Sequence, residues 1–255
     1  AAAWHDKAAA LAVAGELAER EARSSQAILG RGGRPAAAFA DRPTIAATGL
    51  RVLVGGREIA FPDFRIEPGE KVAITGPSGA GKTTLIALLA GLVRPATGRI
   101  EIAGRLLDDD CADDWRSIIG HIGQHPHLLN ASLQANIALS DGRADPSRLQ
   151  ASLQAAAIDG LAEILPQGIG TRLGENGSGV SGGEARRLMM ARAIYSGARV
   201  ILADEPTADL DAETAERVIT ALDEAARGGA TLVIATHDPR LVARLDRTID
   251  LGGSQ

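Results

Sequence analysis

Short apolar runs bounded by glycine and proline dominate the chain from Ile45 onward. Runs of this length are typical of β-strands. The later ones alternate with segments in which apolar residues recur at helical spacing, which favours a largely parallel α/β sheet. The strands expected on this basis are residues 50–54, 58–61, 64–66, 71–75, 99–103, 118–123, 200–203, 231–235 and 248–251.

Helical spacing without a convincing strand extends from His125 to Arg199, notably over residues 146–158 and 181–195. A helical insertion within an α/β core is the simplest explanation. The Ala-rich first 30 residues predict a marginal amphipathic helix, followed by a Gly/Pro/Arg linker at residues 29–35. A disordered chain end is the alternative for this segment.

Composition limits the classes of function. Of the 255 residues, 45% are hydrophobic and 23% are charged, and the net charge of -5 has the wrong sign for a general nucleic-acid binder. The single cysteine, Cys111, cannot form an internal disulfide, so a reduced cytosolic compartment is the default expectation. The most apolar uncharged run, residues 83–93, is too short to cross a bilayer. His121, His125 and His127 have no cysteine or acidic residue between them, which does not favour a metal site.

Residues 76–83 read GPSGAGKT, which fits the pattern G-x-x-x-x-G-K-[ST] between a predicted strand and a predicted helix. Glycines let consecutive backbone N–H groups turn toward a phosphate, and the N-terminus of the following helix adds a positive dipole end. The lysine reaches the β and γ phosphates and the Thr83 hydroxyl binds Mg²⁺. The segment therefore predicts a nucleotide site formed by Gly76, Pro77, Ser78, Gly79, Ala80, Gly81, Lys82, Thr83 and Thr84.

An acidic pair follows the buried strand in VILADEP, residues 200–206. Asp204 is suited to hold Mg²⁺, and Glu205 to deprotonate an attacking water. None of the three lysines follows an asparagine, so the N-K-x-D pattern of guanine-specific enzymes is absent and ATP is favoured over GTP.

A second glycine-containing motif, SGGE, opens the helix predicted after Ser181. Ser181 and Glu184 fit the capping-box pattern, which by itself marks only a good helix start. Gly182 and Gly183 lower helix propensity, however, which suggests that another group approaches the backbone there. An anion at the helix N-terminus would explain them.

The motifs in this order resemble the nucleotide-binding domain of ABC transporters over about residues 45–251. GPSGAGKT resembles Walker A, VSGGE the LSGGQ signature, and VILADEP Walker B with its catalytic glutamate. Gln124 resembles the Q-loop glutamine, TADLD at residues 207–211 the D-loop, and His237 the switch histidine. An ordinary loop glutamine at Gln124 and a strand-end histidine at His237 are the alternatives for those two residues.

The resemblance implies an α/β fold of the P-loop NTPase class, with a RecA-like parallel core, a small antiparallel β subdomain and an inserted α-helical subdomain. Residues 1–44 would be the end of a membrane-domain helix and a linker. Residues 45–125 and 191–251 would form the β subdomain and core, residues 126–190 the helical subdomain, and residues 252–255 a tail.

The resemblance also implies a head-to-tail dimer that holds two ATP molecules with Mg²⁺, each between Walker A of one subunit and the signature of the other. Asp209 or Asp211 would communicate across this dimer. The catalytic set would be Glu205, His237, Lys82 and Gln124, and the metal ligands Thr83, Gln124 and Asp204. The signature contacts to ATP would come from Ser181, Gly182, Gly183 and Glu184.

The subclass that the chain resembles is the exporter type, through the segments LLNASLQANI at residues 128–137 and LGENGSGVSGG at residues 173–183. QHPHLL, SGGEARRL and ATHDPRLVARLDRTIDL resemble the thiol-reductant (cysteine and glutathione) exporter for cytochrome bd assembly, most of all its CydD-like subunit. The implied partners are an exporter transmembrane domain and a second ATPase domain, without nucleic acid, at the cytoplasmic face of the bacterial inner membrane. A soluble ABC-type ATPase acting on nucleic acid or the ribosome is the alternative function, and a regulatory module without turnover is a third.

One position departs from the family pattern. The family stacks adenine on an aromatic residue ahead of Walker A, and alignment on residues 50–54 puts Val54 there. Loss of the stack predicts weaker adenine binding and relaxed base choice. Phe61 or Phe64 is a possible substitute.

Overall fold

The structure is a computed structural model that describes residues 29–30, 39, 42–124, 126, 128–139, 144–174 and 179–252. The helix predicted in the first 30 residues lies outside these residues except for Leu29 and Gly30, which are not helical, and His125 and His127 also lie outside them. The strands are β1 (Ile45–Val54), β2 (Arg57–Ala60), β3 (Phe64–Ile66), β4 (Lys71–Thr75), β5 (Thr97–Ile102), β6 (Arg105–Leu106), β7 (Ile119–Ile122), β8 (Val200–Asp204), β9 (Thr231–Ala235) and β10 (Arg247–Asp250). The helices are α2 (Lys82–Leu89), α3 (Ala112–Arg116), α4 (Leu133–Ile137), α5 (Pro146–Ala155), α6 (Leu161–Ile164), α7 (Gly182–Ser196), α8 (Ala212–Arg227) and α9 (Pro239–Val242), with a 3₁₀ turn at Gly168–Gly170.

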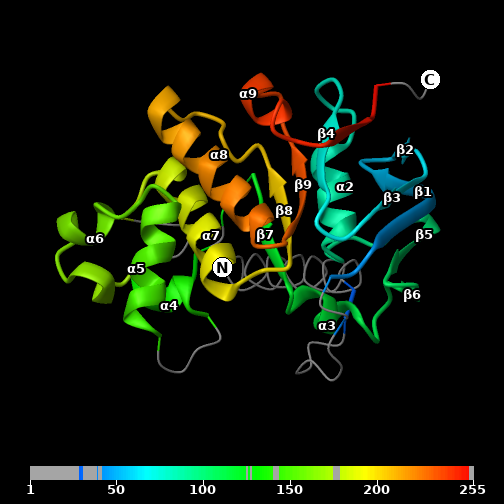
Figure 1. The fold of residues 1–255 in the computed structure, drawn as a ribbon. Helices are drawn as coiled ribbons and strands as arrows, with labels where there is room; N and C mark the ends of the chain where they lie inside the picture. The colour runs from blue at the N-terminus through cyan, green and yellow to red at the C-terminus, as the bar shows by residue number, and fades with distance from the viewer. Residues whose placement is uncertain are drawn as a thin grey trace, which may run out of the picture.

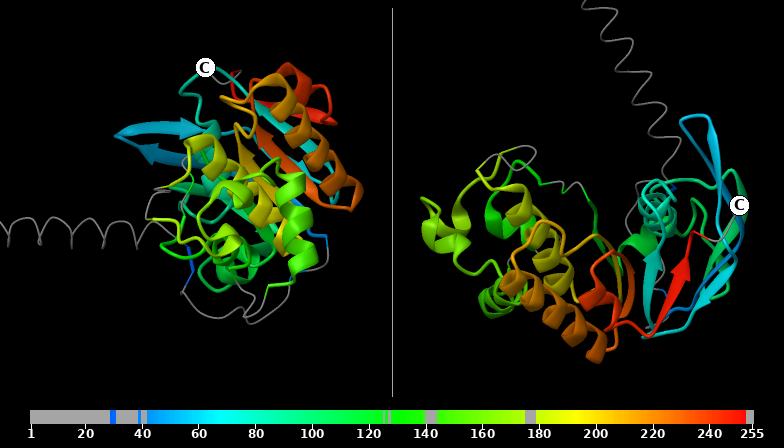
Figure 2. Two further views of the ribbon diagram at one scale, coloured as in Figure 1. Left: turned by 90° about the vertical axis from the view of Figure 1, so that its left-hand side faces the viewer. Right: turned by 90° about the horizontal axis from the view of Figure 1, so that it is seen from above.

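Two sheets organise the fold. One is parallel, with strand order β10-β4-β9-β8-β7, and the other is antiparallel, with order β2-β1-β5-β6 and β3 paired to β1. The antiparallel sheet lies at one end of the molecule and helices α4, α5 and α6 at the other, with the parallel sheet between them (Figure 1). Figure 2 shows the same succession from above.

The parallel sheet is buried on both faces because helices cover it. Helix α2 packs against one face and helices α7 and α8 against the other. Successive side chains of a strand point to opposite faces, so Leu202 and Val233 join the core around α2, while Ile201 and Leu232 join the core around α7 and α8. Such two-sided burial explains why β8 and β9 read as continuous apolar runs.

The predicted strands are all present, and the long segment between β7 and β8 contains helices and no strand among its described residues. Strand β1 begins at Ile45, five residues earlier than predicted, because Ala46 and Thr48 pair with β5 although they are weakly apolar. The two-residue strand β6 was not predicted, since it carries no alternation of its own and exists only through its pairing with β5. Met189 and Met190 on α7 are buried in the core, where flexible methionine side chains fill irregular gaps.

No helix in the described part of the chain is both long and apolar enough to span a bilayer.

Candidate functional site

The phosphate-loop segment connects the end of β4 to the start of α2. Gly76, Gly79 and Gly81 have φ angles of 143°, 79° and 97°, which residues other than glycine rarely adopt. A Cβ atom on Gly81 would also lie 3.1 Å from Ile59 Cγ2 and 3.2 Å from the Phe61 ring. The glycines are therefore required by both the backbone turn and the packing beneath it.

Lys82 is the first residue of α2 and is buried. Its ammonium donates hydrogen bonds to the carbonyl oxygens of Gly76 and Pro77, at 2.8 Å and 3.1 Å. The cation is thus held inside the loop, where backbone N–H groups and a helix N-terminus also favour an anion. Thr83 in the first turn of α2 is exposed, as is Gln124 just after β7, and Thr84 is half-buried.

The carboxyl ends of four neighbouring parallel strands bring the predicted residues to one edge of the sheet. The phosphate loop follows β4, His237 follows β9, Glu205 follows β8, and Gln124 follows β7. Parallel strands end on the same side, and ligands of open α/β sheets bind outside these ends. Residues far apart in the sequence therefore face one region.

Asp204, the last residue of β8, is only 2% exposed. Its Oδ2 atom is buried and accepts no hydrogen bond from the described residues. An unpaired buried carboxylate oxygen is costly unless it serves another purpose. Carboxylate and hydroxyl oxygens are the donors that Mg²⁺ prefers, so Asp204 and Thr83 fit this cation.

Glu205 and His237 lie side by side. The His237 backbone N–H donates to Glu205 Oε2 at 3.3 Å, and His237 Nε2 lies 3.7 Å from Glu205 Oε1. Glu205 has a φ of 49°, an unfavourable left-handed conformation for a glutamate, and its N–H donates to the carbonyl of Ala235. The strained backbone and the contact with His237 together fix the direction of the carboxylate.

Ser181 caps helix α7 at a separate place in the fold. Its hydroxyl accepts from the Glu184 N–H, and the Glu184 carboxylate accepts from the Ser181 N–H and hydroxyl, at 2.6 Å and 2.7 Å, so the predicted capping box is confirmed. Gly182 has open space where a Cβ would lie, and neither it nor Gly183 has a positive φ. Among the described residues, nothing would clash with a Cβ atom at position 182, so packing within this chain does not explain the glycine there.

The two aspartates of residues 207–211 have different environments. Asp211 caps helix α8 by accepting from the Thr214 N–H, and the hydrogen bond from the Thr214 hydroxyl lowers the pKa of Asp211. Asp209 has a φ of 62° and an 88% exposed side chain. Asp209 therefore presents its carboxylate to solvent, with Arg186 3.9 Å away, whereas the carboxylate of Asp211 is engaged in the cap.

Val54 is the last residue of β1, in the hairpin with β2, and 46% of its surface is exposed. Phe61 is buried beneath Gly81, so the suggestion that it replaces an exposed stacking residue is wrong. An aliphatic pair, Leu53 and Val54, is the apolar surface that this hairpin exposes.

A contact that the sequence patterns did not suggest links α7 to the residues after β8. Arg186 donates to the carbonyl oxygen of Ala208 at 2.7 Å. Its only sequence signal is an arginine close to the buried face of α7, which is too common to single out.

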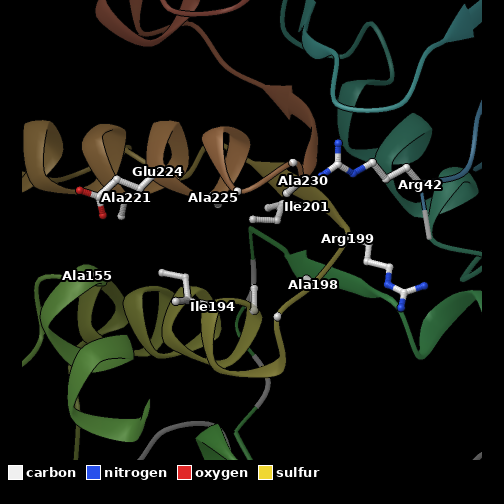
Figure 3. A pocket seen from close by; sticks show the side chains of 14 residues that line it. Arg42, Ala155, Ile194, Ala198, Arg199, Ile201, Ala221, Glu224, Ala225 and Ala230 are labelled. Atoms are coloured by element: carbon white, nitrogen blue, oxygen red, sulfur yellow. The ribbon is translucent and has the colours of Figure 1, made fainter. Parts of the chain in front are cut away.

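A cavity of about 480 Å³ lies between α7 and α8, away from the predicted site (Figure 3). Arg42, Ala198 and Ala230 line it at the opposite ends of the strands, and none of the predicted site residues does.

Comparison with known proteins agrees with this geometry. The family model described as ABC transporter matches residues 61–208. The chain is 39% identical over 183 residues to the transport ATP-binding protein AarD of Providencia stuartii, covering 72% of this chain and 31% of that protein. It is 39% identical over 196 residues to an ATP-dependent lipid A-core flippase of Ralstonia nicotianae, covering 76% of this chain and 33% of the flippase.

A third relative is the mycobactin import ATP-binding/permease protein IrtB of Mycolicibacterium thermoresistibile, with 38% identity over 186 residues, 73% of this chain and 32% of that protein. The chain thus spans about a third of the length of these relatives. Among solved structures, a bacterial Atm1-family ABC exporter with ATP bound matches with a TM-score of 0.75 and 30% identity, over 88% of this chain and 40% of the exporter. These relatives are named as transport proteins, which does not favour action on nucleic acid or ribosomes.

Proposed function

The chain belongs to the ABC transporter family, whose ATPase domains use ATP with Mg²⁺, and from this premise we propose that it hydrolyses ATP to drive an exporter. The observation that carries the proposal is the meeting of the phosphate loop, Gln124, Glu205 and His237 at one edge of the parallel sheet. In an exporter, this chain would be the ATPase part at the cytoplasmic face of the membrane, joined to a transmembrane domain.

Each residue has a role in the proposed reaction. The loop N–H groups and Lys82 would bind the β and γ phosphates, and Thr83, Asp204 and Gln124 would hold Mg²⁺, which neutralises charge on the phosphates. Glu205 would accept the proton of the attacking water, and His237 beside it would contact the γ phosphate. The in-line attack then releases phosphate and ADP. The exposed tip at Val54 would contact the base.

We extend the proposal to the partner. Two copies would associate head to tail, with Ser181, Gly182 and Gly183 of one copy against the ATP in the loop of the other. The open space at Gly182, together with the N-terminus of the 15-residue helix α7, supports an approach by a phosphate there. Glu184 would hold Ser181 in place, and Asp209 would face the partner.

The domain division follows from the same proposal. Residues 45–125 and 191–251 would form the β subdomain and core, and residues 126–190 the helical subdomain. Two hydrophobic cores support such a division, although the core around α7 also takes residues from β8 and β9. Residues 1–44 would connect to the membrane part, and residues 252–255 would be a tail.

Complementation between two inactive variants tests the proposal. Lys82→Ala should abolish nucleotide binding, and Ser181→Arg should block the facing site of the partner, so neither variant alone should hydrolyse ATP. Mixed in equal amounts, they should recover about a quarter of the wild-type rate, because half of the dimers are mixed and each of those has one intact site. A mixture as inactive as its components would contradict the head-to-tail arrangement, and turnover by Lys82→Ala would contradict the site.

For the cargo we propose thiol reductants such as cysteine and glutathione. The supporting signal is the resemblance of QHPHLL, SGGEARRL and the segment after β9 to the CydD-like exporter subunit. The relatives named as a lipid A-core flippase and a mycobactin importer supply the competing cargo classes. Uptake of labelled glutathione, but not lipid A, by inside-out vesicles containing the full transporter would support thiol cargo, and the reverse result would contradict it.

A further inference from the structure

Arg186 lies in the second turn of α7, and its side chain is only 12% exposed. One terminal nitrogen donates to the carbonyl oxygen of Ala208 at 2.7 Å and lies 3.9 Å from Asp209 Oδ2. The Nε atom is buried and donates to none of the described residues. Burying an arginine with one nitrogen unpaired is unfavourable for stability alone. A role for the hydrogen bond to Ala208 beyond stability would account for the buried arginine.

Ala208 belongs to the turn of residues 205–210, which connects β8 to the cap of α8. The Ala208 N–H donates to the carbonyl of Glu205 at 3.1 Å, and the Glu205 N–H donates to the carbonyl of Ala235 at 2.8 Å. A continuous hydrogen-bonded path thus runs from α7 through Ala208 to the backbone of Glu205. Both Glu205 and Asp209 have left-handed backbones, so the turn needs outside contacts to keep its shape.

The same turn also places an apolar side chain, that of Leu210, near the start of α7. A Cβ atom built on Gly183 would lie 3.9 Å from Leu210 Cδ2, and Leu210 packs against the core around α7. The turn is therefore linked to α7 in two ways, by the packing of Leu210 against the core around α7 and by the hydrogen bond from Arg186. The hydrogen bond from Arg186 is directional, because a guanidinium donates along fixed N–H directions.

We propose that Arg186 is a positioning residue for ATP hydrolysis, which ties helix α7 to the turn that orients Glu205 and Asp209. This inference rests on the proposed function, since it assigns Glu205 to the reaction. A shift of α7 would then be transmitted to the general base of the same chain. Helix α2, which begins at Lys82, packs against the opposite face of the sheet from α7.

Arg186→Met tests the proposal, because methionine fills much of the volume of the arginine stem but donates no hydrogen bond. The turnover number should fall at least about tenfold, the range expected for a lost hydrogen bond from a charged donor. The affinity of the Lys82 loop for a fluorescent ATP analogue should change by less than about twofold, because Lys82 is held by hydrogen bonds to the carbonyls of Gly76 and Pro77, which lie outside the path. Amide hydrogen exchange at Ala208 should become faster, while exchange in α2 stays unchanged.

Arg217→Met is the matched control. Arg217 also donates to a backbone carbonyl, that of Gln154, and pairs with Asp159 at 2.8 Å, and both of these partners lie outside the turn. This variant should keep wild-type turnover and wild-type exchange at Ala208.

A wild-type turnover number in Arg186→Met, joint loss of turnover and ATP affinity, or unchanged exchange at Ala208 would each overturn the proposal. If Arg186→Met does not fold, Arg186→Lys replaces it, since lysine lacks the planar donor. Slower turnover together with faster exchange at Ala208 would support the role of Arg186. Wild-type turnover with wild-type exchange would contradict it. If the wild-type chain itself hydrolyses no ATP, the proposed function fails, while the exchange at Ala208 still tests the link.

Discussion

Asp204→Asn should stabilise the protein without nucleotide and remove its stabilisation by Mg²⁺ and ATP. The Asp204 carboxylate is 2% exposed, and its Oδ2 atom has no hydrogen-bond donor among the described residues. Leaving such a group unpaired costs about 1–3 kcal/mol or more. Asparagine has nearly the same shape but is neutral, so it is easier to bury. We expect a gain of about 1–2 kcal/mol in unfolding free energy, or roughly 2–8 °C in melting temperature.

Thermal unfolding with and without Mg²⁺ and ATP measures both effects. Ligand at a hundred times its Kd stabilises a protein by about 2.7 kcal/mol, and Asp204→Asn should lose most of the part that depends on Mg²⁺. The matched control is Asp223→Asn, since Asp223 is also buried but is paired with Arg244 at 3.0 Å and lies 3.6 Å from Lys71. That control should destabilise the protein. A less stable Asp204→Asn variant, or one that keeps the full Mg²⁺-dependent shift, would refute the reasoning.

Three further predictions concern single side chains. Ser181→Ala removes the cap of α7 and should lower the unfolding free energy by about 1 kcal/mol in urea titrations, with an unchanged midpoint contradicting the cap. The hydrogen bond from Arg240 lowers the pKa of Asp238 below its ordinary 3.8, so ionised Asp238 stabilises the fold near neutral pH and that stabilisation is lost as the pH falls through the lowered pKa. Asp238→Asn keeps an equally good cap of α9, so its melting temperature should fall less than that of the wild type below about pH 4; parallel curves would contradict this. Val54→Tyr should tighten ATP binding about fivefold or more by restoring a stack worth about 1–3 kcal/mol. The wild type should discriminate ATP from GTP by less than about a hundredfold in competition binding.

Local patterns were sufficient to predict most of the fold. The apolar runs of β4, β8 and β9, the glycines of the phosphate loop and the capping box of Ser181 and Glu184 all depend on neighbours within a few residues. The meeting of Gln124, Glu205 and His237 at one edge follows once the sheet is parallel, because parallel strands end on the same side.

What the sequence could not predict depends on contacts between distant segments. The burial of Phe61 beneath Gly81 and the hydrogen bond from Arg186 to Ala208 arise only when the chain is folded. The left-handed backbones of Glu205 and Asp209 have no local signal, since neither residue is a glycine and each is held by its surroundings.

The measurement that tests the account most directly is made on Glu205→Gln with Mg²⁺ and ATP. Glutamine keeps the size of the side chain but cannot accept the proton of water, so turnover should fall at least about a hundredfold while ATP still binds. Light scattering during size-exclusion chromatography should then find an ATP-bound dimer, which hydrolysis no longer separates. Wild-type turnover in this variant would contradict the role of Glu205, and a monomer saturated with ATP would contradict the proposed dimer.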